Sequence, residues 1–304
     1  FGPERVFDIP TSENAMTGIG IGAALYGLRP VMVHQRLDFA LLSMDQLVNS
    51  AAKWHYMFGG QCSVPITIRL VLGRGWGQGP THSQSLHAWF AHIPGLKVVM
   101  PTTAEDAKGL LLSSIFDDNP VVFMEHRWLH GMQGAVPMGD RRIPLGKARI
   151  MHEGRDVTIV SMSYMSVEAI HAVEYLEAAG ISCELIDLRT IKPLDWDTIY
   201  CSVEKTGRLL ALDIGSELCS VAGEIVARVA TERFGFLKQA PCRLAMPDCP
   251  VPTSPALTAG YYKRAEDIVD TVGGMLGKDL NVNALRLGRT TPHDVPGDWF
   301  KGPF

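Results

Sequence analysis

The sequence lacks several features that would each assign a protein to a class. No apolar run reaches the roughly 18 residues of a transmembrane helix, and the first residues show no signal-peptide pattern. The 28 basic and 32 acidic residues leave a formal net charge of −4, which provides no basic field for nucleic acid. The chain also has no internal repeat and no low-complexity segment. We therefore expect no membrane and no nucleic-acid partner.

Cysteine is scarce and scattered. The six cysteines include no C-x-x-C pair, which argues against a zinc site or a redox-active pair. Their spacing favours reduced thiols in a cytoplasmic compartment, or in the mitochondrial matrix if the protein is eukaryotic. With 46% apolar and 20% charged residues, the composition is ordinary for a protein with sizeable cores.

Apolar runs alternate with helical patterns along most of the chain. This alternation predicts an α/β fold of two doubly wound domains with mostly parallel sheets. We expect strands at 30–34, 65–71, 97–100, 121–125, 157–162, 182–187 and 208–213. We expect helices at 43–56, 103–117, 166–179, 195–203 and 221–234. Thr102 or Thr103 is a suitable N-cap, and Gly180 and Gly207 stand where a helix ends before a strand.

A polar connector containing glycine and proline separates the two alternating halves. We therefore place a first domain at 1–137, a linker at 138–154, a second domain at 155–275 and a tail at 276–304. The tail loses periodicity, but three of its last six residues are aromatic. Docking of these aromatics on a neighbouring surface and a mobile terminus are equally open interpretations.

The segment from Arg5 to Gly22 is the most informative part of the sequence. It reads R-V-F-D-I-P-T-S-E-N-A-M-T-G-I-G-I-G: a β-type run over 5–9, a polar turn, and a glycine-rich helix start. A single carboxylate, Glu13, lies on the turn between apolar residues, which favours a raised pKa and proton transfer. On spacing alone, an acid at a helix N-terminus capped by Ser12 or Thr11 is the more ordinary interpretation.

A dinucleotide-binding pattern also occurs in this segment. Gly18, Gly20 and Ala23 satisfy G-x-G-x-x-A, and Asp38 follows twenty residues after Gly18. The glycines do not come directly after an apolar strand, so a nicotinamide dehydrogenase is a distant alternative. Close packing of this helix on a neighbouring helix explains them better.

Two motifs carry a family resemblance. D-I-P-T-S-E at 8–13 and H-S-Q-S at 82–85 resemble the beta subunit of the thiamine-diphosphate-dependent 2-oxoacid dehydrogenases, which act on pyruvate, branched-chain oxoacids and acetoin. The resemblance runs from about Phe1 to Met275 and implies a transketolase-like pyrimidine-binding domain followed by a transketolase C-terminal-like domain. It implies oxidative decarboxylation of a 2-oxoacid with acyl transfer to a lipoyl group.

The resemblance also implies roles for individual residues. In the family, the acid matching Glu13 hydrogen-bonds N1′ of the thiamine aminopyrimidine and so promotes loss of the cofactor's C2 proton. Thr11 lies in the same cofactor-binding turn. Phe39 matches an aromatic that stacks on the aminopyrimidine, and Gln35 matches a residue of that pocket. His82 matches a histidine of the active-site channel, where imidazole performs acid–base chemistry.

A monovalent cation is a further implication of the resemblance. The turn F-D-D-N-P at 116–120 is similar to one that holds K⁺ in some family members. The candidate ligands are Ile66, Ser114, Asp117 and Asn119. An ordinary Asx turn before Pro120 fits the same residues.

Some residues depart from the family pattern and leave alternatives open. Arg36, Arg74 and Trp76 are not the residues usual at these positions. The two arginines line the expected substrate pocket and favour, as an alternative, a split transketolase-like enzyme acting on a sugar phosphate. A third interpretation is a non-catalytic assembly or regulatory paralogue. Retention of Glu13, Phe39 and His82 speaks against it.

The magnesium motif of thiamine diphosphate enzymes, G-D-G followed by asparagine, is missing. Gly139-Asp140-Arg141 comes nearest and lacks the second glycine. In the family a separate alpha subunit carries this motif. The resemblance therefore implies a cofactor shared between subunits, Mg²⁺ held by the partner, and an assembly of two alpha and two beta subunits. A lipoyl-bearing acyltransferase is a possible further partner, and the chain alone is expected to be inactive.

One motif of the second half is predicted to be structural. D-L-R-T-I-K-P-L-D at 187–195 resembles the family pattern D-L-R-T-x-x-P-L-D and opens the central connection of the second domain. We interpret it as an interface element without a catalytic role.

Overall fold

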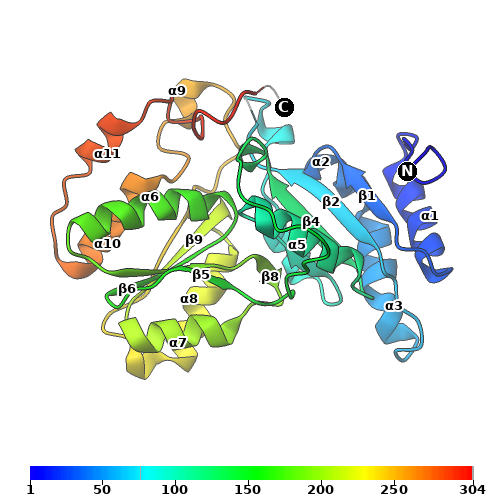
Figure 1. Cartoon of the computed structure of the whole chain (residues 1–304), viewed down its shortest axis with the longest axis horizontal. Helices are drawn as coiled ribbons and strands as arrows, with labels where there is room; N and C mark the ends of the chain where they lie inside the picture. Colours follow the sequence, from blue (N-terminus) through cyan, green and yellow to red (C-terminus); the bar gives the residue numbers. More distant parts are fainter. Residues whose placement is uncertain (76, 303–304) are drawn as a thin grey trace.

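The chain folds around two five-stranded sheets that lie side by side, as the computed structural model in Figure 1 shows. The structure describes residues 1–75 and 77–302, so the predicted loop residue Trp76 lies outside the described residues. The two-sheet α/β architecture confirms the predicted fold class.

The first sheet is parallel apart from one edge strand. Its order is β1-β2-β4-β3-β8, and β8 alone is antiparallel to its neighbour. The strands are β1 (Val31–His34), β2 (Thr67–Leu72), β3 (Lys97–Val99), β4 (Val121–His126) and β8 (Thr190–Lys192). All but one residue of β4 are buried, as expected of a central parallel strand covered on both faces.

The helices of the first half follow the predicted alternation. They are α1 (Glu13–Leu25), α2 (Leu37–Ala40), α3 (Ala52–Met57), α4 (His87–His92) and α5 (Ala104–Ile115). The Thr103 side chain accepts a hydrogen bond from the Asp106 N–H at the start of α5, which confirms the predicted N-cap. The helix predicted over 43–56 includes a π-helix, Gln46–Ala51, before α3.

Of two local predictions near the N-terminus, one is wrong and the other is confirmed in part. Residues 5–9 form a turn and extended chain with mostly exposed side chains, and no strand pairs with them. The packing predicted for the glycines is confirmed at Gly18, where an added Cβ atom would lie 3.4 Å from Oε1 of Gln46 on the neighbouring π-helix. At Gly20 an added Cβ atom would lie 2.8 Å from the Met32 sulfur, so this glycine lets α1 approach strand β1. Ser12 is the N-cap of α1, but its side chain makes no capping hydrogen bond.

The second sheet has the order β10-β9-β6-β7-β5, again parallel except at one edge, where β5 is antiparallel. Its strands are β5 (Arg149–His152), β6 (Val157–Ser161), β7 (Cys183–Asp187), β9 (Leu209–Ser216) and β10 (Cys242–Met246). Its helices are α6 (Tyr164–Ala178), α7 (Trp196–Thr206), α8 (Val221–Glu232), α9 (Pro255–Thr258) and α10 (Ala265–Leu276). Gly180 and Gly207 have φ of +74° and +72°, the left-handed conformation predicted for them. Strand β5 lies within the segment predicted as a linker.

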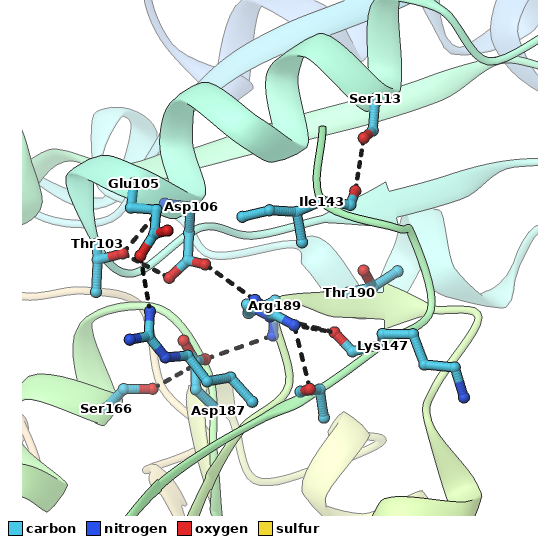
Figure 2. A network of polar contacts seen from close by, with 12 residues as sticks. Thr103, Glu105, Asp106, Ser113, Ile143, Lys147, Ser166, Asp187, Arg189 and Thr190 are labelled. Atoms are coloured by element: carbon cyan, nitrogen blue, oxygen red, sulfur yellow. Dashed lines mark hydrogen bonds and ion pairs between the residues drawn. The ribbon is translucent and has the colours of Figure 1, made fainter. Parts of the chain in front are cut away.

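Arg189 joins the two halves. The second half supplies β8 to the first sheet, and just before β8 Arg189 has a positive φ of 56°. Figure 2 shows its guanidinium between the halves: Nη1 lies 3.2 Å from Oδ1 of Asp106, and Nη2 donates to the carbonyls of Lys147 and Ala148. The Arg189 carbonyl also accepts from the Met100 N–H at 2.8 Å. These contacts confirm the structural role predicted for the D-L-R-T motif.

The C-terminal segment docks on the molecule. After α11 (Asn283–Gly288) it runs, red in Figure 1, back toward the loops of the first half. The Trp299 indole N–H donates to the Trp128 carbonyl at 2.7 Å. Asp294 forms an ion pair with Arg74. Of the two interpretations left open for the tail, docking is confirmed for the described residues. No helix in the described part of the chain is long and apolar enough to cross a membrane.

Candidate functional site

The candidate site residues gather where strands of the first sheet end. Parallel strands place their carboxyl ends on one edge, and ligands of open α/β sheets bind along that edge. Strand β1 leads into Gln35 and then into α2, which contains Phe39. Strand β2 leads into the glycine-rich loop that ends with the short helix Pro80–His82.

Phe39 and His82 are brought together. Their ring centroids lie 5.3 Å apart in an edge-on arrangement, and Phe39 keeps 37% of its surface exposed. A hydrogen bond forms a second contact between this segment and α2: the Gln84 side-chain amide donates to Oδ1 of Asp38 at 2.6 Å. Burial raises the pKa of Asp38, against the lowering effect of this hydrogen bond. The Gly73 N–H closes the loop by donating to the Gln84 carbonyl.

Glu13 begins α1 beside His34. Its carboxylate is partly exposed, and Thr11 and Gln35 are exposed. His34 is 5% exposed, and no hydrogen-bond partner of its Nε2 lies within the described residues. Burial lowers the pKa of His34, and the nearby Glu13 carboxylate partly offsets this. No sequence pattern marks His34 as functional, because its inward position on a strand is typical of any core residue.

The two arginines predicted for the substrate pocket have other partners. Arg36 is buried and donates to the side chain of Gln78 in the glycine-rich loop. Burial lowers the pKa of Arg36, and the neighbouring Arg127 lowers it further. Arg74 contacts the segment before α9 and the tail. Its Nη1 donates to the Pro252 carbonyl before α9, and its Nη2 pairs with Asp294 of the tail at 2.7 Å. The structure therefore brings Arg74 to the tail and not to the Phe39–His82 pair.

Cationic side chains from other segments already contact the turn predicted to bind K⁺. Arg29 donates to the carbonyls of Ile115 and Asp117, at 3.2 and 2.8 Å, and the Asp117 carboxylate pairs with Lys97. The Asn119 N–H donates to Oδ1 of Asp117, so the alternative Asx turn is present.

The other two predicted K⁺ ligands also have protein partners. Both were predicted to contribute backbone carbonyls: the Ile66 carbonyl accepts from the Val121 N–H, and the Ser114 carbonyl accepts from the Asp117 N–H at 3.3 Å. Within the described residues, no group of three His, Cys, Asp or Glu residues could hold a metal ion.

A buried pair between the halves was not predicted. His87 Nε2 lies 2.8 Å from Oδ1 of Asp213, and both side chains are almost fully buried. Asp213 also accepts from the N–H groups of Gly215 and Ala222. Burial opposes its charge, yet His87 and these hydrogen bonds hold the pKa of Asp213 below its ordinary value. Local sequence patterns carry no signal for this contact, which joins residues 126 positions apart.

Comparison with known proteins agrees with this geometry. Residues 1–132 match the family described as transketolase, pyrimidine binding domain, and residues 146–268 match transketolase, C-terminal domain. A solved structure described as split gene transketolase, inactive beta4 tetramer, superposes with a TM-score of 0.73 over 90% of this chain and 85% of that chain. At 23% identity this likeness shows the fold alone.

Curated relatives are more similar in sequence. The acetoin:2,6-dichlorophenolindophenol oxidoreductase subunit beta of Cupriavidus necator is 45% identical over 87% of this chain and 78% of that protein. The pyruvate dehydrogenase E1 component subunit beta of Rhizobium meliloti is also 45% identical, over 90% of this chain but 59% of that protein. The Bacillus subtilis acetoin oxidoreductase subunit beta is 42% identical over 91% of this chain and 81% of that protein. The chain therefore belongs to the transketolase-like family of pyruvate and acetoin dehydrogenase beta subunits.

Proposed function

We propose that this chain is the beta subunit of a thiamine-diphosphate-dependent 2-oxoacid dehydrogenase. Its reaction is the oxidative decarboxylation of a 2-oxoacid with acyl transfer to a lipoyl group. The observation that carries the proposal is the placement of Phe39 and His82 in contact at the same sheet edge to which α1 brings Glu13. The relatives of this chain support the same reaction class.

The exposed residues at this edge fit the pyrimidine half of the cofactor. When bound, thiamine diphosphate supplies the reactive carbon and stores the electrons left after loss of carbon dioxide. Phe39 offers a partly exposed ring for stacking on a flat heterocycle. Glu13 is a carboxyl able to hydrogen-bond a ring nitrogen. We propose that His82, whose ring contacts Phe39, transfers a proton to a substrate oxygen.

The remaining half of the cofactor requires a partner. The described residues contain no cluster of metal ligands, and the sequence lacks the G-D-G motif. We propose that an alpha subunit holds Mg²⁺ and the diphosphate in an assembly of two alpha and two beta chains, served by a lipoyl-bearing acyltransferase. The compartment we propose is the cytoplasm, or the mitochondrial matrix in a eukaryote. K⁺ at the 116–120 turn would have to displace Arg29 and Lys97, so we do not include it.

Exposed apolar side chains support an obligate partner. They lie on α1, on the outer face of edge strand β1 and on the helical turn after α2, at the outer edge of the first half in Figure 1. Large contiguous apolar surface is typical of permanent interfaces. The most exposed of these residues are Ile19, Tyr26, Leu28, Val31, Val33 and Leu42.

The split transketolase alternative loses its main support. It depended on Arg36 and Arg74 as free cations for a sugar phosphate. The charge of Arg74 is balanced by the buried Asp294 carboxylate, and Arg36 is buried against Gln78. Neither guanidinium is placed as an exposed anion site beside Phe39.

The test is Glu13→Gln in the complex copurified with the native partner. We expect 2-oxoacid-dependent acylation of lipoamide to fall at least about 100-fold, the usual contribution of a positioned acid or base. Binding of thiamine diphosphate with Mg²⁺ and the melting temperature should change little. Glu174→Gln, an exposed acid on α6, is the matched control. Full activity of the Glu13 variant contradicts the proposal, and a lone homodimer without cofactor binding favours the non-catalytic paralogue.

A further inference from the structure

A cavity of about 390 Å³ lies between the two halves, behind the loop that ends at His82. The loop residues Arg74, Ser83 and Leu86 form one wall, and residues from 214–216 and 246–263 form the opposite wall. His82 is not part of the lining, because its ring packs against Phe39 on the other side of the loop. The cavity is therefore separate from the cofactor edge. Its volume lies within the range of about 300–1,000 Å³ usual for small-molecule sites.

Several polar side chains of the lining are paired within the protein, but the Ser83 hydroxyl is not. The Ser83 hydroxyl belongs to a side chain that is 3% exposed, and it has no hydrogen-bond partner within the described residues. The Tyr262 hydroxyl is also buried and lies beside the Arg74 guanidinium. Buried polar groups are normally paired, and each unpaired one costs free energy unless a ligand or water satisfies it. The unpaired Ser83 hydroxyl in this cavity points to a polar ligand.

The charge of the lining is positive. None of the lining residues is Asp or Glu, whereas Arg74 and Lys263 are cationic. Asp294 neutralises Arg74. Lys263 has no ion-pair partner among residues 1–75 and 77–302, so its ammonium group is the uncompensated charge of the cavity. This charge favours an anionic ligand.

The rest of the lining is aromatic and apolar. Trp128 packs edge-on against Tyr164 at 4.8 Å between ring centroids and contacts Tyr262 at 4.9 Å. Met246 and Val251 complete this side. An inorganic anion would leave such a wall uncovered, whereas a flat or branched hydrocarbon body would cover it.

We propose that this cavity binds a small organic carboxylate, with its apolar body on Tyr262 and Val251 and its carboxylate on Lys263 and Ser83. The site goes beyond the proposed function, because it does not use the cofactor edge. Its occupant contacts the back of the loop whose front presents His82. Binding therefore orders residues 80–86 and fixes His82 against Phe39.

The experiment is calorimetric titration of the purified complex with benzoate, compared with neutral benzamide and with inorganic phosphate. We expect saturable binding of benzoate, at least about 10-fold tighter than either comparison compound. Lys263→Gln should weaken benzoate binding at least about 10-fold and Ser83→Ala at least about 3-fold. Lys278→Gln, an exposed lysine outside the cavity, is the matched control and should bind as the unaltered chain does.

Hydrogen exchange gives the second measurement. Benzoate should slow amide exchange in residues 80–86 of the unaltered chain at least about 3-fold, and Lys263→Gln should abolish this protection. The proposal is overturned if benzoate does not bind, if Lys263→Gln and Ser83→Ala bind it unchanged, or if phosphate binds equally well. Benzoate binding that survives both substitutions would place it elsewhere, including the cofactor edge, and would also reject the site.

Discussion

Arg74 and Asp294, which are 220 positions apart in the sequence, form an ion pair of 2.7 Å in which each side chain is at most 6% exposed. Arg74 belongs to the glycine-rich loop before His82, and Asp294 belongs to the C-terminal tail. The Asp294 carboxylate also accepts from the Thr258 hydroxyl. The tail is therefore bonded to the loop that carries a candidate catalytic residue.

Asp294→Ala should destabilise the protein by about 3 kcal/mol, because removing one partner leaves a buried charge uncompensated. The tail should also become more sensitive to protease, since its link to the loop is lost. Chemical denaturation and limited proteolysis measure the two effects. Asp298→Ala, an exposed acid four residues away, should change neither. Equal stability of the two variants would show that the pair contributes nothing net.

Arg189→Ala should cost about 3 kcal/mol of unfolding free energy, because Asp106 is fully buried and loses its cationic partner. Arg149→Ala is the control at the same junction. Arg149 pairs with Glu105, and both side chains are about 40% exposed, so its loss should cost less than about 1 kcal/mol. Similar costs for the two substitutions would contradict a special role of the buried pair. Denaturant titration at constant salt distinguishes them.

Gly73→Ala should destabilise the loop before His82. Gly73 has a φ of +78°, and an added Cβ atom would lie 2.4 Å from Nε2 of His126. Gly139→Ala isolates the backbone contribution, because Gly139 has a φ of +77° with nothing within 4 Å. We expect Gly139→Ala to lower the unfolding free energy by about 1 kcal/mol and Gly73→Ala to lower it by at least about twice as much. Thermal unfolding of both variants decides whether the contact with His126 adds to backbone strain.

Asp187→Asn should make stability less dependent on pH. Burial raises the pKa of Asp187 to about 7 from an ordinary 3.8, and no hydrogen-bond partner of its Oδ2 lies within the described residues. The folded state therefore binds the proton more tightly than the unfolded state. Stability from this group is full below about pH 4 and is lost as pH rises to about 7.

The asparagine variant should gain stability relative to the unaltered chain over that interval, by up to about 4 kcal/mol for three pKa units at about 1.4 kcal/mol each. Denaturation curves at several pH values test this. Asp270→Asn, at an exposed position, should differ from the unaltered chain in unfolding free energy by the same amount at every pH. If the unfolding free energy of Asp187→Asn also differed from that of the unaltered chain by the same amount at every pH, the Asp187 carboxyl would titrate normally in the folded protein.

Local sequence signals predicted most of the fold. Thr103, Gly180 and Gly207 act at helix ends as their chemistry requires, and the alternating apolar runs became parallel strands. Strand β8 was missed because three residues after a motif carry too little periodicity to indicate a strand. Strand β10, only partly buried, lacks the continuous apolar run of its neighbours.

The candidate site was predictable only in part. The motifs placed Phe39 and His82 at the ends of successive strands, and the structure brings their rings together. The sequence carries no signal for the partners of Arg74 and His87, because each pairs with an acid in the other half. Whether an arginine is free for a substrate depends on contacts more than a hundred residues away, which local patterns do not contain.

The antiparallel pairing of β3 with β8 has a mechanical consequence. Val98 faces Lys192 and Val99 faces Thr190 in this ladder, so backbone hydrogen bonds cross from one half to the other. A hinge motion that separated the halves would break this ladder and the Arg189 contacts together. The two halves should consequently move as a single rigid body. A ligand then enters the space between the halves only when loops and side chains move, because the halves themselves do not separate.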